Sequence, residues 1–251
     1  MGEPLLAVAG LTKRFGGLLA TDQVSLSIPE GELHAIIGPN GAGKTTVIAQ
    51  LAGEIRPDSG AIRFSGEDIV SLPAFVRSAR GLARSFQITS VFREFTALEN
   101  IALAVQAHAG HSFRFWRPAR IDRALLGPAS EILERVNLAA RAGDPAAILS
   151  HGEKRALEIA MALATGPRLL LLDEPMAGMG PEDSAQMVRL LAKLKRDLTI
   201  VLIEHDMDAV FALADCVTVL VYGRVIATGK PDAIRANHDV RQAYLGADEV
   251  G

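Results

Sequence analysis

The stretch GPNGAGKTT, from Gly38 to Thr46, has residue types and spacing suited to holding a phosphate group. It fits the pattern G-x-x-x-x-G-K-[ST], in which Lys44 would reach the phosphate oxygens and the Thr45 hydroxyl would ligate Mg²⁺. Glycines let backbone N–H groups close around an anion, and the following helix would aim the positive end of its dipole at it. The predicted nucleotide-binding loop is therefore Gly38, Pro39, Asn40, Gly41, Ala42, Gly43, Lys44, Thr45 and Thr46.

An acidic pair, Asp173 and Glu174, follows the apolar run Leu169–Leu172. Ligands of α/β sheets gather at the carboxyl ends of strands, so both carboxylates are expected near the phosphate loop. The aspartate suits Mg²⁺ coordination, and the glutamate could act as a general base toward water. An acidic pair before proline is by itself a common turn, but beside a phosphate loop it predicts nucleotide hydrolysis.

Two further polar residues stand at predicted ends of core elements. His205 follows the run TIVLIE and could hydrogen-bond a γ-phosphate, although a single histidine is more often structural. Gln87 lies where the strand pattern gives way to helices, and its amide could touch both Mg²⁺ and water; the alternative is a plain surface residue. The predicted catalytic residues are Glu174, His205 and Gln87, and the predicted metal ligands are Thr45, Gln87 and Asp173.

A second helix start that could face phosphate lies upstream of the acidic pair, in the stretch LSHGE. Ser150 and Gly152 stand just before a helical pattern that begins at Glu153. A hydroxyl, a backbone N–H and a helix dipole together suit an anion. The chain therefore carries two phosphate-sized sites, which raises the question of whether both serve the same nucleotide.

An α/β scaffold is needed to hold these residues. The apolar run Glu32–Gly38, which ends in glycine, predicts a strand before the phosphate loop. Short apolar runs predict strands buried on both faces of a sheet at Leu169–Leu172, Thr199–Ile203 and Cys216–Val221. Helical patterns separate them at Lys44–Ala52, Glu153–Ala164, Asp183–Leu194 and Met207–Ala214. This alternation predicts a parallel α/β core, and the alternating runs at 5–11 and 24–28 predict an added antiparallel sheet.

Between about residues 86 and 164 the strand pattern stops and the segment becomes helical. We interpret residues 88–164 as a helical subdomain inserted into an α/β core of residues 1–87 and 165–251, so that the whole chain, 1–251, forms a single domain. Within this segment, FRFWRPAR could touch lipid headgroups or a membrane subunit, although such a mixture is more often a solvated loop. Phe92 and Phe95 could line a groove for a partner helix or pack in the core.

Composition excludes some classes of protein. The 251 residues are 49% hydrophobic and 22% charged, which suits a globular protein with a sizeable core. A net charge of −3 gives no electrostatic reason to expect nucleic acid. The single cysteine, Cys216, cannot form an intrachain disulfide and is expected to be a buried structural thiol. We find no signal-peptide pattern and no window apolar enough for a membrane span, so work at a membrane would require a partner.

Together these motifs resemble, in order and over nearly the whole chain, the ATP-binding subunits of ABC transporters. GPNGAGKTT resembles Walker A, LLLLDE Walker B, LSHGE the signature motif and AGMG the D-loop. Phe15 would stack on adenine, Gln87 would be the Q-loop glutamine and His205 the switch histidine. The resemblance implies the α/β P-loop fold of an ABC ATPase, with ATP and Mg²⁺ as cofactors and ATP hydrolysis as the activity.

The resemblance also implies a role for the second phosphate site. In this family two ATPase subunits pack head to tail, and the signature motif of one closes over the ATP held by the other. Ser150, Gly152 and Glu153 would then bind a nucleotide across the interface, and closure would do work on membrane subunits. Whether the dimer pairs two copies of this chain or two different ATPases stays open.

A finer resemblance is to the LivG-type subunits of importers for branched-chain amino acids, carried by IEHDMDAV and the tail GKPDAIRANHDVRQAYLG among other stretches. It implies two membrane permease subunits, a second ATPase subunit, an extracytoplasmic solute-binding protein and a place on the cytoplasmic face of the inner membrane. Importers of urea, short amides or other small organic solutes share these stretches, as in part does the lipopolysaccharide-export ATPase. Soluble ABC proteins and P-loop kinases fit less well, because the chain has one phosphate loop, no heptad array and the stretch LSHGE.

Three positions depart from the usual family pattern. The signature normally reads LSGGQ, and here His151 replaces a glycine and Glu153 replaces glutamine. Glu153 could stabilise the helix dipole from the first turn, point toward a ribose, or do both. Gly180 stands where the D-loop usually has aspartate, which puts communication across the interface at that position in doubt.

Overall fold

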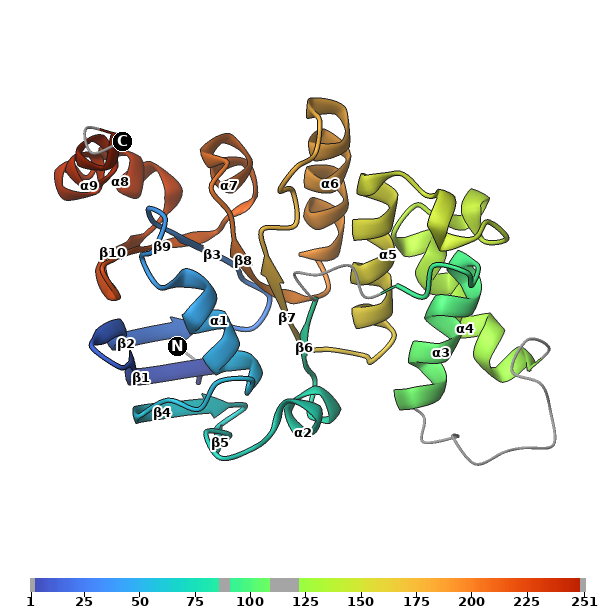
Figure 1. The fold of residues 1–251 in the computed structure, drawn as a ribbon, viewed down its shortest axis with the longest axis horizontal. Coiled ribbons are helices and arrows are strands. Elements are labelled where there is room, and N and C mark those ends of the chain that lie inside the picture. Colours follow the sequence, from blue (N-terminus) through green and yellow to red (C-terminus); the bar gives the residue numbers. More distant parts are fainter. Residues whose placement is uncertain (1–2, 86–90, 109–121, 249–251) are drawn as a thin grey trace.

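The computed structural model describes residues 3–85, 91–108 and 122–248 (Figure 1). The strands are β1 Leu6–Phe15, β2 Leu18–Ile28, β3 Leu33–Ile37, β4 Ser59–Phe64, β5 Glu67–Asp68, β6 Leu82–Arg84, β7 Leu169–Asp173, β8 Thr199–Ile203, β9 Cys216–Val221 and β10 Arg224–Gly229. The α-helices are α1 Lys44–Ala52, α2 Ala74–Ala79, α3 Ala97–His108, α4 Arg123–Arg135, α5 His151–Leu163, α6 Pro181–Leu194, α7 Met207–Leu213, α8 Pro231–Ala236 and α9 His238–Asp248.

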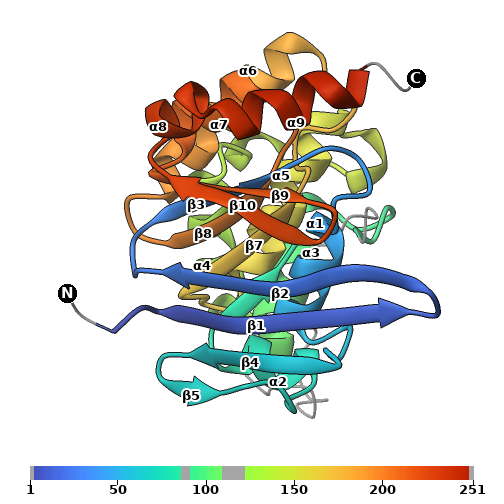
Figure 2. The ribbon, with the colours of Figure 1, turned by 90° about the vertical axis from the view of Figure 1, so that its left-hand side faces the viewer.

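Two sheets organise the described chain. Strands β2, β1, β4 and β5 form an antiparallel sheet in that order, and β10, β9, β3, β8, β7 and β6 form a second one. In the second sheet β9, β3, β8, β7 and β6 run parallel, and β10 is an antiparallel edge strand. Figure 2 shows the antiparallel sheet below the edge formed by β9 and β10. The predicted fold class, a parallel core with an added antiparallel sheet, is confirmed.

The central strands are apolar throughout because both faces of their sheet are covered. In β7, Leu170 and Leu172 pack into one hydrophobic cluster with α5 and α6, whereas Leu169 and Leu171 pack into another with α1 and the antiparallel sheet. Successive side chains of a strand point to opposite faces, so a strand covered on both needs an unbroken apolar run. The phosphate loop thus follows β3, a strand in which all residues are buried.

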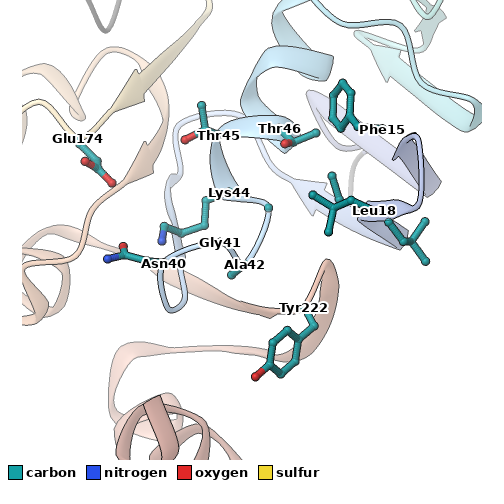
Figure 3. A pocket seen from close by; sticks show the side chains of 13 residues that line it. Phe15, Leu18, Asn40, Gly41, Ala42, Lys44, Thr45, Thr46, Glu174 and Tyr222 are labelled. Carbon is teal, nitrogen blue, oxygen red and sulfur yellow. The ribbon is translucent and has the colours of Figure 1, made fainter. Parts of the chain in front are cut away.

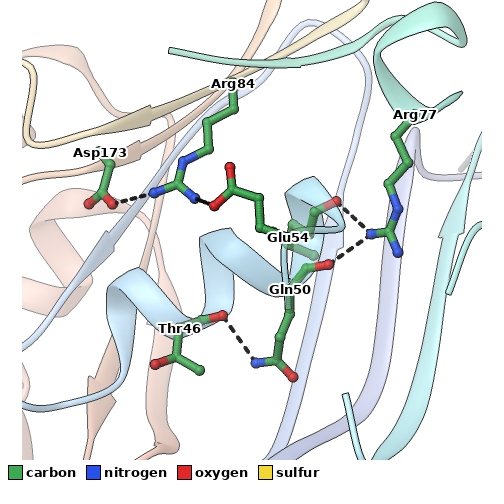
Figure 4. A network of polar contacts seen from close by, with 7 residues as sticks. Thr46, Gln50, Glu54, Arg77, Arg84 and Asp173 are labelled. Carbon is green, nitrogen blue, oxygen red and sulfur yellow. Dashed lines mark hydrogen bonds and ion pairs between the residues drawn. The ribbon is translucent and has the colours of Figure 1, made fainter. Parts of the chain in front are cut away.

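Helix α1 is fixed at its C-terminal end by one buried arginine. Arg77 donates from Nη1 to the carbonyl oxygens of Gln50 and Leu51, at 2.8 and 2.7 Å, and from Nη2 to that of Val70 at 3.0 Å (Figure 4). The last carbonyls of a helix have no partner within it, and a cation there is favourable. Because α1 begins at Lys44, Arg77 holds the helix that carries the phosphate loop.

Helices α3, α4 and α5 pack together on the side of the parallel sheet away from the antiparallel one (Figure 1). Asn100, buried in α3, donates to the carbonyl oxygens of Phe92 and Thr96 and accepts from the N–H of Phe92. The helical character predicted for this region holds in the residues that the structure describes. The boundary of a separate subdomain at residues 88 and 164 stays a prediction.

The predicted core elements appear with shifts of at most two residues at their ends. Helix α1 and strands β8 and β9 have the predicted bounds, and α5 begins at His151 instead of Glu153. Elements missed from the sequence are β4, β5, β6, β10, α2, α8 and α9. All but α9, which has 11 residues, are short, and several are partly exposed edges, so they lack a clear apolar period. Among described residues, no helix is long and apolar enough to cross a membrane.

Candidate nucleotide site

A cavity of about 520 Å³ opens where the phosphate loop meets the antiparallel sheet (Figure 3). Its walls come from four parts of the chain: the turn between β1 and β2, the phosphate loop with the start of α1, the end of β7, and the turn between β9 and β10. The lining residues are Phe15, Leu18, Leu19, Ala20, Asn40, Gly41, Ala42, Gly43, Lys44, Thr45, Thr46, Glu174 and Tyr222. The structure thus brings together most of the predicted phosphate loop, the predicted general base and the predicted adenine-stacking residue.

Helix α1 begins at this cavity with its N–H groups uncapped. Gly43, the residue before the helix, has φ 97°, and among the described residues no side chain caps the first turn with a hydrogen bond. A Cβ on Gly43 would lie 2.2 Å from the carbonyl oxygen of Ala20, so both its conformation and its surroundings require glycine. Free N–H groups at a helix start form an anion site. The loop therefore fits a phosphate group.

Lys44 is buried and its ammonium group is held inside the loop. Nζ donates to the carbonyl oxygen of Gly38 at 2.7 Å and to that of Pro39 at 3.1 Å. Burial lowers the pKa of Lys44, and the nearby charges of Glu174 and Asp173 oppose that effect. A buried cation with only neutral oxygens as hydrogen-bond partners is well placed to receive an anion.

Glu174 and Asp173 lie at the end of β7, but they face different surroundings. Glu174 has φ 48°, an unusual conformation for a residue with a side chain, and its N–H donates to the carbonyl oxygen of Ile203 at 3.0 Å. Its side chain lines the cavity opposite Thr45 (Figure 3). Such strain is maintained only where surrounding structure holds it, and it is common at active sites.

Asp173 is buried beside Arg84, which also binds Glu54 (Figure 4). Arg84 Nη2 lies 3.0 Å from Asp173 Oδ2, and Nη1 lies 2.5 Å from Glu54 Oε2. Burial raises the pKa of Asp173, and the Arg84 guanidinium works against that rise. Asp173 Oδ1 is buried without a hydrogen-bond partner among the described residues. An unpaired buried carboxylate oxygen near the Lys44 loop fits Mg²⁺ or a water bound to it.

His205 lies at the end of β8 but does not line the cavity. Its side chain is 63% exposed, and Nδ1 lies 3.7 Å from Glu204 Oε2. Glu204 itself is buried; burial raises its pKa, and its carboxylate accepts from the N–H groups of Met176 and His205. Glu204 thereby joins the segment after Glu174 to the histidine. Gln87, predicted to contact Mg²⁺ and water, lies outside the described residues.

The predicted second phosphate site forms a capped helix start away from the cavity. Ser150 Oγ accepts from the N–H of Glu153 at 3.1 Å, and Glu153 Oε2 accepts from the N–H of Ser150 at 2.8 Å. This reciprocal pair is a capping box. Glu153 also pairs with Arg141 at 3.0 Å, so its carboxylate stabilises the helix start in the isolated chain. None of Ser150, Gly152 and Glu153 lines the cavity.

Neighbouring elements constrain Gly152 and His151 at this helix start. A Cβ on Gly152 would lie 3.0 Å from the Asp183 carboxyl carbon in α6, so glycine allows the two helices to approach. His151 Nε2 lies 3.2 Å from the carbonyl oxygen of Ala177, which ties α5 to the segment following Glu174.

Sequence reasoning missed Tyr222 and Leu18 as lining residues. Tyr222 is 86% exposed and lies with Gly223 in the tight turn between β9 and β10, both with positive φ. Leu18 is 67% exposed and follows the turn after β1. The sequence could not identify them as lining residues, because nothing in it places these two turns beside the phosphate loop.

The family emerges from comparison with known sequences. Residues 21–177 match the family described as ABC transporter, and residues 224–250 match the family described as branched-chain amino acid ATP-binding cassette transporter. The chain belongs to the ABC transporter family. This ABC protein is therefore an ATP-binding and ATP-hydrolysing subunit of a transporter.

Curated relatives match the ABC protein over nearly its full length. The branched-chain amino acid transport ATP-binding protein BraF of Pseudomonas aeruginosa is 44% identical, with 98% of this chain and 99% of the relative covered. LivG of Escherichia coli, described in the same words, is 40% identical over the same shares. Among solved structures, the ADP conformation of an ATP-binding cassette of an ABC transporter superposes with a TM-score of 0.86 at 29% identity, covering 98% of this chain and 100% of that one.

A second, larger cavity of about 980 Å³ lies at the C-terminal end of α1 in this ABC protein. It runs between α2 and helices α3 and α5, and its walls include Phe75, Ala104 and Met161. Glu54 and Arg84 of the Asp173 network also line it. Phe92 and Phe95, predicted as groove or core residues, are not in its lining: Phe92 is 54% exposed, and the two rings contact each other at 5.6 Å.

Proposed function

We propose that this ABC protein powers an importer of branched-chain amino acids. The observation that carries the proposal is the similarity of 44% and 40%, over nearly the full length, to two proteins described as high-affinity branched-chain amino acid transport ATP-binding proteins. The match of residues 224–250 to the branched-chain family supports it independently, because that segment lies outside the general ABC match. The same ATPase role for urea, short amides, another small solute or lipopolysaccharide export is the alternative.

In the proposed site, the phosphate loop holds the ATP phosphates and Phe15 stacks on the adenine. Lys44 binds phosphate oxygens in place of its present carbonyl partners, and the free N–H groups at the start of α1 add to the anion site. Phe15 is 47% exposed at the rim of the cavity, where an aromatic face is accessible. Tyr222 lies on the same rim and widens the surface available to the nucleoside.

Mg²⁺ is proposed to bind between Thr45 and Asp173, with Gln87 as a third contact. Thr45 is exposed at the first turn of α1, and Asp173 has an unpaired oxygen. The ion would neutralise phosphate charge. Glu174 would take the proton from the attacking water, and His205 would hydrogen-bond the γ-phosphate.

The nucleotide site is proposed to be completed by a second ATPase subunit, which is either another copy of this chain or a different chain. Ser150, Gly152 and Glu153 lie outside the cavity of their own chain. The exposed hydroxyl and the N-terminus of α5 are therefore available to a nucleotide bound by a partner. This arrangement accounts for two phosphate-sized sites in one chain, because each would serve a different ATP.

The groove of about 980 Å³ is the proposed docking site for a membrane subunit. Its apolar walls suit an inserted helix. Arg84 lines the groove and also contacts the predicted metal ligand Asp173, so an occupant of the groove would lie close to the hydrolysis site. Two permease subunits, an extracytoplasmic solute-binding protein and a position at the cytoplasmic face of the inner membrane complete the proposal.

Two experiments test this function in sequence. The chain is first purified from gently solubilised membranes, and every accompanying protein is identified. Two permease-like chains, a second ATPase and an amino-acid-type binding protein are expected. The complex is then reconstituted in vesicles, and ATP-dependent uptake of labelled leucine, isoleucine and valine is compared with that of urea and acetamide, with the Glu174→Gln complex as the inactive control.

Uptake of the branched-chain amino acids alone supports the proposal. Uptake of urea or acetamide in their place keeps the ATPase chemistry and replaces the solute. Recovery with export machinery, or without membrane chains, overturns the import function.

A further inference from the structure

Among the described residues, one cluster of metal-ligating side chains lies away from the nucleotide cavity. Glu32, His34 and Cys216 each offer one ligand atom, and these atoms all lie within 4.8 Å of one another. The cluster forms at the amino ends of β3 and β9, whereas the phosphate loop leaves the carboxyl end of β3. The length of that strand, about 3.3 Å per residue, separates the two sites. The ATPase chemistry proposed above uses none of the three residues.

The backbone fixes the three side chains relative to one another. His34 is the register partner of Cys216 in the parallel pair of β3 and β9. Glu32 lies two residues before His34, which places both side chains on the same face where the strand begins. The two strand starts are also tied together, since the N–H of Leu33 donates to Asp215 Oδ2 at 2.9 Å and the N–H of Asp215 donates to the carbonyl oxygen of Leu33 at 2.9 Å.

The His34 ring is oriented from both of its nitrogens. Nδ1 lies 2.7 Å from Glu32 Oε1, and Nε2 lies 2.8 Å from Thr218 Oγ1. Thr218 is fully buried and its hydroxyl lies 2.9 Å from that of Thr228. Histidines that bind metals are normally held by a hydrogen bond at the nitrogen that does not bind, and this chain of hydroxyls supplies one.

The surroundings of His34 favour positive charge. Burial by itself would lower the pKa of His34, but hydrogen bonds to Cys216 and Glu32, together with their charges, outweigh it and raise the pKa to about 9. A divalent ion would bring positive charge to the same place. Its binding requires a neutral imidazole, a thiolate and a carboxylate, so the proton on the ring would pass to solvent as the ion enters.

We propose that Glu32, His34 and Cys216 bind a divalent transition-metal ion, zinc first, through one carboxylate oxygen, Nδ1 and Sγ. Zinc lies about 2.0 to 2.3 Å from such ligands, which places the ligand atoms of a tetrahedral site about 3.3 to 3.7 Å apart. The present ligand atoms lie within 4.8 Å of one another, so they would close by up to about 1.5 Å to reach this spacing. A nitrogen, sulfur and oxygen set excludes Mg²⁺ and Ca²⁺ as the preferred ions. Glu32 and Cys216 are partly exposed, so water can reach the fourth position.

Partial exposure of Cys216 also corrects the expectation of a buried structural thiol. The sequence offered no reason to join it to His34, because 181 residues separate the two in the chain and only the pairing of β3 with β9 makes them neighbours.

Cobalt(II) tests the site directly. It replaces zinc in such sites, and its bond to a thiolate gives a charge-transfer absorption in the near ultraviolet. Cys216 is the single cysteine of the chain, so this band in the untagged, nucleotide-free protein can arise only from Cys216. We expect the band to saturate at one equivalent of Co²⁺ and to disappear when one equivalent of Zn²⁺ is added.

Three variants and one control assign the remaining ligands. Cys216→Ser should abolish the band, and His34→Gln and Glu32→Gln should each weaken Co²⁺ binding at least tenfold. His238→Ala removes an exposed histidine and should leave the titration unchanged. Circular dichroism identifies any variant that fails to fold; Glu32 is only partly buried, so Glu32→Gln keeps the test decisive if His34→Gln unfolds. Absence of the band in the parent chain, or a band unaffected by Glu32→Gln in folded protein, overturns the proposal.

Discussion

The two ends of the parallel sheet carry their reactive groups in different ways. At the carboxyl ends of β3 and β7, the groups come as two pairs of sequence neighbours: Lys44 and Thr45 in the first turn of α1, and Asp173 and Glu174 where β7 ends and its loop begins. At the amino ends of β3 and β9, Glu32, His34 and Cys216 lie on or beside the strands themselves, and only register brings them together. Loops can reshape around a nucleotide and a partner, whereas groups on paired strands keep nearly one geometry.

This difference bears on what each end can do. Among the described residues, the nucleotide end has an uncapped helix start, an Asp173 oxygen without a hydrogen-bond partner and a strained Glu174, all of which are costly in the isolated chain and favourable once a ligand is bound. The opposite end has its polar atoms paired, from Glu32 through His34 to Thr218 and Thr228. The nucleotide end is therefore suited to change conformation when a ligand binds. The amino ends of β3 and β9 are suited to keep nearly one backbone geometry.

The largest expected effect is on hydrolysis at the nucleotide end. Glu174→Gln keeps the shape of the side chain but removes the base, so ATP turnover should fall by about 100-fold or more while ATP binding is kept. Steady-state turnover and equilibrium binding of a fluorescent ATP analogue measure the two effects. Glu67→Gln, an exposed glutamate on β5, is the matched control and should change neither. Unchanged turnover in Glu174→Gln would remove Glu174 from this role.

Loss of the buried cation should weaken nucleotide binding next. Lys44→Ala leaves the phosphates without their charged partner, and truncating one member of a buried charge pair costs about 2 to 5 kcal/mol, or about 30-fold and upward in affinity. The same fluorescence titration measures it. Lys193→Ala, at the far end of α6, removes a lysine of the same kind from the surface and should bind normally. Normal affinity in Lys44→Ala would disprove the phosphate-loop assignment.

The Arg84 network should show in the pH dependence of turnover. Arg84 opposes the rise that burial gives to the pKa of Asp173, so Arg84→Met should raise that pKa further. A protonated Asp173 is a poor metal ligand, so on acidification the variant should lose activity at a higher pH than the parent. Below both pKa values its turnover should be lower by about tenfold for each pH unit between the two acid limbs. Turnover of Arg84→Met and parent should converge toward alkaline pH.

Arg80→Met is the control for this profile, because Arg80 pairs with the exposed Glu67 and not with Asp173. A uniform loss at every pH in Arg84→Met would indicate that the arginine acts only through the groove or through folding. If the variant keeps its activity and its acid limb stays at the parent's pH, Arg84 does not influence the pKa of Asp173.

The sequence predicts the two ends of the sheet unequally, and the reason is physical. The sequence predicts that Lys44, Thr45 and Glu174 lie together, because a phosphate loop needs particular residues at fixed spacing and ligands gather at the carboxyl ends of strands. Tyr222 also lines the nucleotide cavity, but no sequence spacing predicts it, because it lies in the distant hairpin of β9 and β10. The contact between His34 and Cys216 could not be predicted either. A sequence pattern predicts that a strand is buried, but tertiary packing sets which strand it pairs with and in which register.

The signature helix offers a smaller effect that separates stability from catalysis. Ser150→Ala removes the side-chain cap of α5, and Asp122→Ala removes that of α4, where Asp122 Oδ1 accepts from the N–H of Ala124 at 3.0 Å; each should cost about 1 kcal/mol of unfolding free energy in a denaturant titration. If Ser150 also contacts a nucleotide held by a partner, Ser150→Ala alone should lower turnover several-fold beyond the loss shared by both variants. Equal turnover in the two would restrict Ser150 to capping.

The smallest expected effect concerns the independence of the two ends. Thr228→Val removes the hydroxyl that meets buried Thr218, so it leaves one buried hydrogen bond unmade at a cost of about 1 kcal/mol in unfolding free energy. The strand between the two ends is packed on both faces, and the loss should remain local. ATP affinity should therefore stay within about twofold of the parent value in the fluorescence titration. A tenfold fall in affinity, with the fold intact, would show that β3 transmits changes from its amino end to the phosphate loop, and the contrast between a fixed end and a changeable end would then fail.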